Sequence, residues 1–319
     1  MDPLVSVVIP CFNAAPWLEA TLDSVRAQTW RRHEIILVDD GSSDGSGKLA
    51  ERLAGADMRV LHQKNSGQCA ALNLGLAGAQ GEFIEYLDAD DLLAPDKIAL
   101  QMARLRELPP GWLATCAWSR FDTNPAEAVF KPEAIWRDLS PVEWLVASWS
   151  GGGMMHGAAW LSPRAVIETA GPWNESLTLI NDLDYFTRLL LSSEGIAFCP
   201  GARTYYRSNV AGSLSRRTGR RSWESAFKAT DLSTTRLLAR EDSPRVRLAS
   251  AINYQRLVYS AYPDVRDLVA KAETRIAELG GCGLEPGGGA VFQNLRRVVG
   301  WKLARRAQIV GRKARGQTS

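Results

Sequence analysis

The sequence is poor in cysteine, and its cysteines form no recognisable motif. The five cysteines among 319 residues are widely scattered, odd in number and never spaced as Cys-x-x-Cys. This usage excludes a disulfide scaffold or a zinc site and is typical of a reducing compartment. A strand-like run begins at Leu4, which leaves no room for the charged and apolar parts of a signal peptide. We therefore expect a cytoplasmic protein.

Long hydrophobic runs and a large excess of one charge are also missing. Residues 144–161 lack Asp, Glu, Lys and Arg, but glycines at 151–153 interrupt them, so we expect a buried segment with a glycine turn rather than a membrane span. With 23% charged residues and a formal net charge of +3, the chain is expected to be globular, not disordered or collagen-like. The charge is too small to favour nucleic-acid binding.

The first ninety residues alternate short β-rich runs with helical patterns. Strands are expected at 5–9, 34–38, 59–61 and 82–87, with helices from Pro16 and over 48–53 and 67–76. Such alternation favours an α/β fold with a Rossmann-like, mostly parallel central sheet flanked by helices.

The rest of the chain divides into a mixed region and a helical one. Strands are expected at 113–118, 157–161 and 196–199, and helices at 141–148, 163–170 and 182–191. Four helical patterns follow, at 223–238, 244–259, 265–279 and 292–310. We expect an α/β domain over 1–215, with halves 1–91 and 92–215, and a helical C-terminal region over 216–319.

Acidic side chains stand where the expected parallel strands end. Residues 39–40 are both Asp, and residues 88–91 read Asp-Ala-Asp-Asp. Ligands of open α/β sheets bind outside the carboxyl ends of the strands. Asp88 and Asp90 are spaced to face one hard cation, Mg²⁺ or Mn²⁺. The alternative is a helix start decorated with acids, which stabilises the helix dipole.

Five segments taken together resemble family 2 glycosyltransferases, which are inverting enzymes of the GT-A fold. The segments are 5–13, 38–44, 65–67, 70–73 and 87–91, in the order and at the spacings of that family. The resemblance implies transfer of a sugar from a nucleoside diphosphate donor, with a UDP-sugar favoured, to a hydroxyl acceptor. It further implies a setting in bacterial surface-glycan assembly.

The resemblance also implies roles for individual residues. Asp90 matches the main metal ligand, Asp88 the residue on the ribose or metal side, and Lys64 a position that is often basic in the family. Pro10, Phe12 and Asp40 match positions that hold the nucleotide base. The donor is expected to contact Pro10, Phe12, Asn13, Asp40, Lys64, Gly67, Asn73, Asp88, Arg207 and Ser213. For the small residues over 65–75, tight packing of a helix on the sheet is the alternative.

An inverting reaction needs a base on the acceptor side, and residues 181–188 resemble the family's Glu-Asp-x-Asp segment. Asp182 matches the catalytic base, although Asn181 stands where Glu is usual. Asp184 is expected to form an i,i+4 pair with Arg188 instead.

Residues 205–213 resemble the family's Tyr-Arg-x-His-x-x-Ser segment, which closes over the diphosphate. Asn209 replaces the histidine, so a metal ligand from this segment is left open. Contact with the diphosphate is expected through Arg207 or Ser213. His156 is read as a packed histidine and is not assigned to catalysis.

The C-terminal tail is basic. Residues 290–319 contain eight Lys or Arg and no acid, with apolar residues near helical spacing. Either an amphipathic helix lies on the anionic inner face of a membrane, or a terminal helix packs on the protein with a cationic end. A membrane-bound tail would suit a lipid-linked acceptor, whereas a glycan acceptor is compatible with both alternatives. The sequence leaves open whether the chain forms a homo-oligomer.

Two other functions remain. A nucleotidyltransferase shares the architecture but normally carries a glycine-rich loop with Arg and Lys after the first strand, where this chain has Cys11, Phe12 and Asn13. A non-catalytic sugar-nucleotide binder is the other, and the presence of both Asp90 and Asp182 counts against it.

Overall fold

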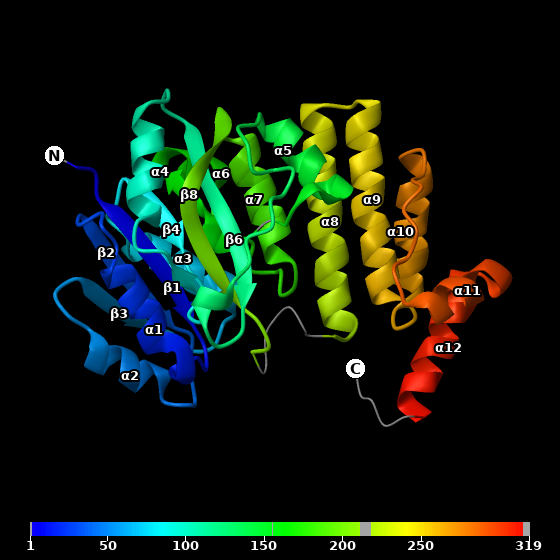
Figure 1. The fold of residues 1–319 in the computed structure, drawn as a ribbon, viewed down its shortest axis with the longest axis horizontal. Coiled ribbons are helices and arrows are strands. Elements are labelled where there is room, and N and C mark those ends of the chain that lie inside the picture. Colours follow the sequence, from blue (N-terminus) through cyan, green and yellow to red (C-terminus); the bar gives the residue numbers. More distant parts are fainter. Residues whose placement is uncertain (1, 155, 211–217, 315–319) are drawn as a thin grey trace.

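An eight-stranded sheet forms the centre of the computed structural model, which describes residues 2–154, 156–210 and 218–314 (Figure 1). The strands run in the order β3-β2-β1-β4-β7-β6-β8-β5. Their bounds are β1 Val5–Cys11, β2 His33–Asp39, β3 Met58–His62, β4 Phe83–Tyr86, β5 Leu92–Leu93, β6 Trp112–Phe121, β7 Trp160–Pro163 and β8 Gly195–Arg207.

The pairing confirms the expected mostly parallel sheet. Strands β1 to β4 are parallel to their neighbours in this group, and β6 is parallel to β8, whereas β7 and β5 run antiparallel. Cys11 at the end of β1 pairs with Asp39 at the end of β2, and Val8 pairs with Tyr86 at the end of β4. The polar segments that follow these strands therefore begin at one edge of the sheet.

Helices pack around this sheet and extend beyond it. Among the described residues, seven α-helices precede residue 195, with bounds α1 Ala15–Arg26, α2 Ser46–Leu53, α3 Gln68–Gly78, α4 Lys97–Arg106, α5 Pro141–Ala147, α6 Arg164–Ala170 and α7 Asn181–Leu191. Every residue of β1 is buried, as expected of a strand covered on both faces. Gly75 of α3 lies so close to β1 that an added Cβ would meet Val8 Cγ1 at 2.5 Å. The small residues of α3 thus serve tight packing on the sheet, the alternative that the sequence had offered.

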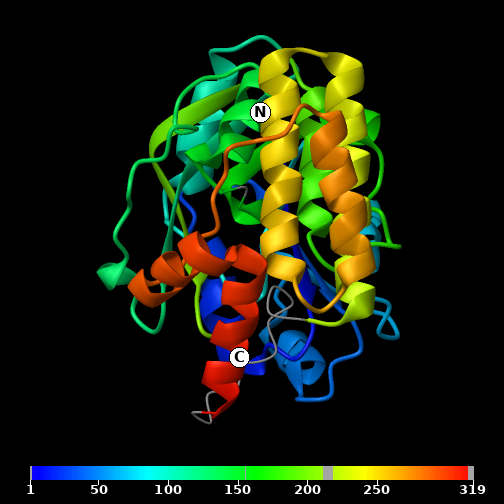
Figure 2. The same cartoon turned by 90° about the vertical axis from the view of Figure 1, so that its right-hand side faces the viewer.

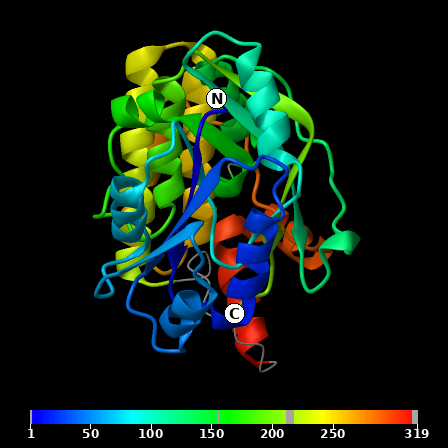
Figure 3. The same cartoon turned by 90° about the vertical axis from the view of Figure 1, so that its left-hand side faces the viewer.

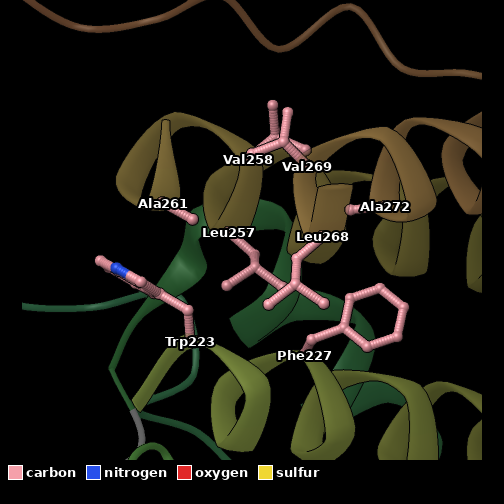
Figure 4. A pocket seen from close by; sticks show the side chains of 8 residues that line it. All are labelled: Trp223, Phe227, Leu257, Val258, Ala261, Leu268, Val269 and Ala272. Atoms are coloured by element: carbon pink, nitrogen blue, oxygen red, sulfur yellow. The ribbon is translucent and has the colours of Figure 1, made fainter. Parts of the chain in front are cut away.

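A second core lies in the C-terminal helices α8 Arg220–Arg240, α9 Pro244–Ala261 and α10 Arg266–Glu278. These three lie side by side in Figure 2, and Figure 4 shows the apolar side chains between them, among them Trp223, Phe227 and Leu257. Helix α8 also packs on α7, which joins the helical part to the α/β part. Helices α1 and α2 occupy the opposite end of the molecule (Figure 3).

Several expected elements need correction. The single helix expected over 292–310 is two helices, α11 Ala290–Val299 and α12 Trp301–Ala314, because Gly300 has a φ of +77°, which ends an α-helix. The strand expected at 196–199 continues to Arg207: the register with β6 jumps after Cys199, so residues 200–202, which include Pro and Gly, form a bulge instead of an end.

Two smaller strand assignments also differ. The strand expected over 157–161 begins only at Trp160, after the short 3₁₀ turn Gly157–Ala159. Strand β5 was not expected at all, because two residues carry no periodic signal.

The described residues include the uncharged stretch, apart from residue 155, and the scattered cysteines that the sequence analysis considered. The uncharged stretch 144–161 contains the end of α5 and, as expected, a glycine turn at Gly151–Gly153; beyond residue 155 it contains the 3₁₀ turn Gly157–Ala159 and the start of β7. No helix in the described ranges is long and apolar enough to cross a membrane. All five cysteines lie within those ranges and are free.

Candidate functional site

Asp40 fixes the loop between β3 and α3 against the end of β2. Its carboxylate accepts hydrogen bonds from Gln63 Nε2 at 2.7 Å, Ser66 N at 2.7 Å and Gly67 N at 2.9 Å. Three donors on one buried carboxylate make strong, charge-assisted bonds. Gly67 has a φ of +94°, a conformation that favours glycine. Asp40 and Gly67 therefore shape the site, and their contact with a donor stays a prediction.

The residues after β1 form the neighbouring wall. Asn13 adopts a left-handed backbone with φ +52°, and its Oδ1 accepts a hydrogen bond from Ser43 N at 2.8 Å. The Phe12 ring is 42% exposed, which leaves it open to stack on a base. Pro10 is buried within β1 beside Val38, so the structure gives it a place in the sheet rather than on the open surface.

Lys64 and Asn73, the other donor contacts expected from the first half, differ in their surroundings. Lys64 is exposed on the loop that Asp40 holds. The Asn73 amide donates to Trp173 O at 3.0 Å and to Glu175 Oε1 at 2.8 Å, and its Oδ1 accepts from Trp173 N at 2.8 Å. Asn73 thus ties α3 to the segment before α7, a structural role that the sequence did not indicate. Its contact with the donor stays a prediction.

The carboxylates that follow β4 lie close together. Burial, followed by the charges of Asp90 and Asp182, raises the pKa of Asp88 to about 7. Burial also raises the pKa of Asp90. The pKa of Asp91 is raised well above its usual range by burial and by the charges of Asp90 and Asp88. Asp88, Asp90 and Asp91 therefore interact with one another, and the charge of Asp182, distant in sequence, acts on Asp88.

A divalent cation fits this neighbourhood chemically. Carboxylate oxygens are the ligands that Mg²⁺ and Mn²⁺ prefer, and a cation bound here would offset both the burial and the charges of neighbouring acids that raise the pKa of Asp88. Within the described ranges, no three His, Cys, Asp or Glu side chains are arranged as a complete metal site. The binding of a cation by Asp88 and Asp90 stays a prediction.

Arg207, at the end of β8, borders the same carboxylates. Its Nε donates to Asp90 O at 2.8 Å, its backbone N donates to Asp91 Oδ1 at 2.8 Å, and its guanidinium lies 4.4 Å from the centre of the Phe121 ring. The long strand β8 thus places the guanidinium group of Arg207 beside the acids that follow β4. The contact of Arg207 with the diphosphate stays a prediction. Ser213 lies outside the described residues.

Asp182 stands in the first turn of α7. Its Oδ1 accepts a hydrogen bond from Leu183 N at 2.9 Å, and burial raises the pKa of its carboxyl. Ile180, immediately before α7, is exposed and left-handed with φ +55°, a strained conformation for a β-branched residue. Such strain is commonly stored beside functional groups.

Asp184, two residues further on, has the structural role that was expected. Its buried carboxylate pairs with Arg188 at 3.2 Å and, in addition, with Arg236 of α8 at 2.5 Å. The i,i+4 pair with Arg188 is therefore confirmed, and the second arginine ties α7 to α8.

The sequence analysis missed Gln68, whose Nε2 donates to Asp88 Oδ1 at 2.9 Å. His156 is packed, as expected: it is buried between the rings of Trp118 and Tyr206, with its Nε2 3.6 Å from Asp91 Oδ2. Burial lowers the pKa of His156 to about 3, so its imidazole is neutral. No motif in the sequence marks either residue.

Comparison with known proteins agrees with this geometry. The model of the family "Glycosyl transferase family 2" matches residues 6–169. An uncharacterized glycosyltransferase of Rickettsia typhi is 32% identical over 196 residues, which are 59% of each chain. One of Rickettsia felis is 31% identical over 193 residues, which are 59% of this chain and 31% of that one. The present chain thus matches less than two thirds of either relative.

Solved structures show the same fold. TarS of S. aureus, residues 1–349, in complex with UDP-GlcNAc superimposes with a TM-score of 0.62, covering 86% of this chain and 88% of TarS at 14% sequence identity. The fold is therefore that of the GT-A glycosyltransferases. Because the family match covers more than half of the sequence, the chain belongs to glycosyl transferase family 2.

Proposed function

We propose that this protein transfers a sugar from a nucleoside diphosphate donor, favouring a UDP-sugar, to a hydroxyl group of a glycan or lipid-linked acceptor in bacterial surface-glycan assembly. The observation that carries the proposal is that Gln68 hydrogen-bonds both Asp88, at 2.9 Å, and Asn181, at 3.1 Å, which supports a common location for the expected metal ligands and the expected base. The UDP-GlcNAc complex of TarS supports the choice of UDP.

In this mechanism Asp182 takes the proton of the acceptor hydroxyl. The hydroxyl oxygen attacks the anomeric carbon while the bond from that carbon to the diphosphate oxygen breaks, which inverts the anomeric centre. The raised pKa of Asp182 makes its carboxylate a stronger base than an ordinary aspartate. Arg207, whose Nε donates to Asp90 O, is the side chain proposed to bind the departing diphosphate.

Mg²⁺ or Mn²⁺ is the proposed cofactor, with Asp90 and Asp88 as its protein ligands. When bound, the cation supplies positive charge that stabilises the leaving diphosphate without a proton transfer. Phe12, exposed beside the Asp40 loop, is the side chain proposed to stack on the base.

We expect thermal unfolding to identify the donor. UDP-, GDP- and dTDP-sugars are added with MnCl₂, with MgCl₂ or with EDTA. Ligand at one hundred times its Kd stabilises the folded state by about 2.7 kcal/mol, which raises the Tm by several degrees. The rise is expected for UDP-sugars and only when the metal is present. No response to any nucleotide sugar would contradict the proposed function.

The proposal divides the chain as the sequence predicted. Residues 1–215 would carry the transfer site, with the donor in 1–91 and the acceptor side in 92–215, and 216–319 would form the helical region. The second apolar core between α8, α9 and α10 supports this division, while Leu237, Val246 and Ala249 pack in the core of the α/β part.

Helices α11 and α12 are proposed to rest on the anionic cytoplasmic face of a membrane. Val291 and Val298, seven residues apart on α11, are both exposed, the latter by 83%. On α12, exposed Leu303 and Val310 flank exposed Arg306 at i,i+3 and i,i+4 spacing. Apolar residues beside cations are typical of helices that lie on anionic bilayers.

We expect the double substitution Val298→Asp and Val310→Asp to weaken binding to phosphatidylglycerol-containing vesicles at least tenfold in a flotation assay. Each added acid opposes the attraction of the basic residues, which is about 1 kcal/mol per Lys or Arg. Val129→Asp, at a valine that is 68% exposed before α5, is the matched control and should bind like the wild type. Equal flotation of all three proteins, or equal binding to neutral vesicles, would refute the membrane contact.

A further inference from the structure

A chain of side-chain hydrogen bonds joins the expected metal ligands to the start of α7. Gln68, the first residue of α3, donates from Nε2 to Asp88 Oδ1 at 2.9 Å. Its Oε1 accepts from Asn181 Nδ2 at 3.1 Å, although Gln68 and Asn181 are 113 residues apart. The side-chain amide of Gln68 thus bridges the donor half and the acceptor half of the site.

The chemistry of the groups fixes the direction of this chain. Gln68 turns its NH₂ toward Asp88 and its carbonyl toward Asn181, the direction that an ionised Asp88, which only accepts hydrogen bonds, requires. Asn181 then donates from Nδ2, and its Oδ1 accepts from the backbone N of Asp182 at 3.0 Å. The side-chain amides of Gln68 and Asn181 are each hydrogen-bonded at both ends. An unbroken chain of hydrogen bonds therefore runs from Asp88 to the backbone N of Asp182, the expected base.

The bridge rests on a helix that is held firmly. Gly75 fits α3 against Val8 of β1, and Asn73 binds Trp173 of the segment that leads to α7. The left-handed Ile180 stands directly before Asn181, so the entry to α7 stays in a strained conformation that its contacts must maintain.

We propose that Gln68 is a positioning residue, which sets the place of Asp182 relative to the donor that Asp88 contacts. The inference rests on the proposed function of the site. It also accounts for Asn181, which stands where the family usually has Glu. A Glu in place of Asn181 would set its carboxylate against the Gln68 carbonyl oxygen, and neither group can donate a hydrogen bond. If Gln68 instead turned its NH₂ toward that Glu, its carbonyl oxygen would face the carboxylate of Asp88.

The test compares Gln68→Leu, Asn181→Leu and the double variant in the release of nucleoside diphosphate from the donor that the wild type uses. We expect each single substitution to lower kcat by about tenfold to a hundredfold, because small displacements of a reacting group cost about that much. The KM for the donor should change less than threefold. The double variant should be no slower than the slower single variant, because both break one chain.

Stability is measured alongside activity to separate positioning from folding. Asn174→Ala, a control in the segment before α7, removes hydrogen bonds to Ser176 only and should leave kcat unchanged. Gln68→Glu places a carboxylate that cannot donate against Asp88 and should be as slow as Gln68→Leu; because its charge repels Asp88 and lowers the Tm, kcat is compared per folded molecule.

The outcomes are separable. If Gln68→Leu keeps the wild-type kcat, or if the effects of the two substitutions on kcat multiply, the bridge does not position the base. If the wild type itself neither binds nor turns over any sugar nucleotide, the proposed function fails instead.

Discussion

Replacing Asp182 by Asn is expected to lower turnover by about a thousandfold, within the range of about 10²–10⁴ for loss of a general base. Asparagine has nearly the same shape, and its side-chain oxygen can still accept the hydrogen bond from Leu183 N. It cannot take a proton, however. Release of nucleoside diphosphate should therefore fall, while binding of the donor, measured by thermal shift, stays unchanged.

The pH dependence gives a second readout of Asp182. A base acts only when ionised, so kcat/KM of the wild type should rise with pH through the pKa of this carboxyl, which burial places above the ordinary value for aspartate. The residual activity of Asp182→Asn should lack this rise. Full activity in the variant would place the base elsewhere.

Asp184→Asn is the informative contrast, because Asp184 shares the helix with Asp182 but points to Arg188 and Arg236. Removing one partner of a buried ion pair costs about 3–5 kcal/mol of stability. This variant should therefore show a lower Tm and a nearly normal kcat per folded molecule, the reverse of Asp182→Asn.

Replacing Asp90 by Asn is expected to remove the response to metal and to lower turnover by about a hundredfold or more. A divalent cation contributes several kcal/mol to the stabilisation of charge on a leaving group, and a neutral amide holds it far more weakly. The backbone oxygen of Asp90 that binds Arg207 is unaffected by the substitution, so this part of the site should persist.

The measurement is a titration of turnover with MnCl₂ after treatment with EDTA. The wild type should be activated, whereas Asp90→Asn should resemble the metal-free wild type at all concentrations. Asp96→Asn, at an exposed acid before α4, is the control and should respond like the wild type. A variant at Asp90 that keeps the wild-type response would exclude this residue as a ligand.

Local patterns were enough to predict most strands of the sheet and the acids at their ends. The apolar run of β1 implied a strand covered on both faces. The carboxyl ends of parallel strands meet at one edge of a sheet, so the acids after β2 and β4 could be expected at the same edge. Asp184 could be assigned to Arg188 because i,i+4 pairing on a helix depends only on spacing. Where backbone geometry departed from regular periods, as at Gly300 and after Cys199, the expected elements were wrong.

By itself the sequence determined the alternation of strands and helices, the acids at the strand ends and membership of the family, since these depend on neighbours in the chain. Only the tertiary structure brought Gln68 to Asp88 and Asn181, His156 to Asp91, and Asn73 to Trp173. These partners are separated by 20 to 113 residues, and a side-chain amide or imidazole gives no periodic signal of what it will meet. Their pairing is decided when the two halves of the chain pack together and every buried polar group must find a partner.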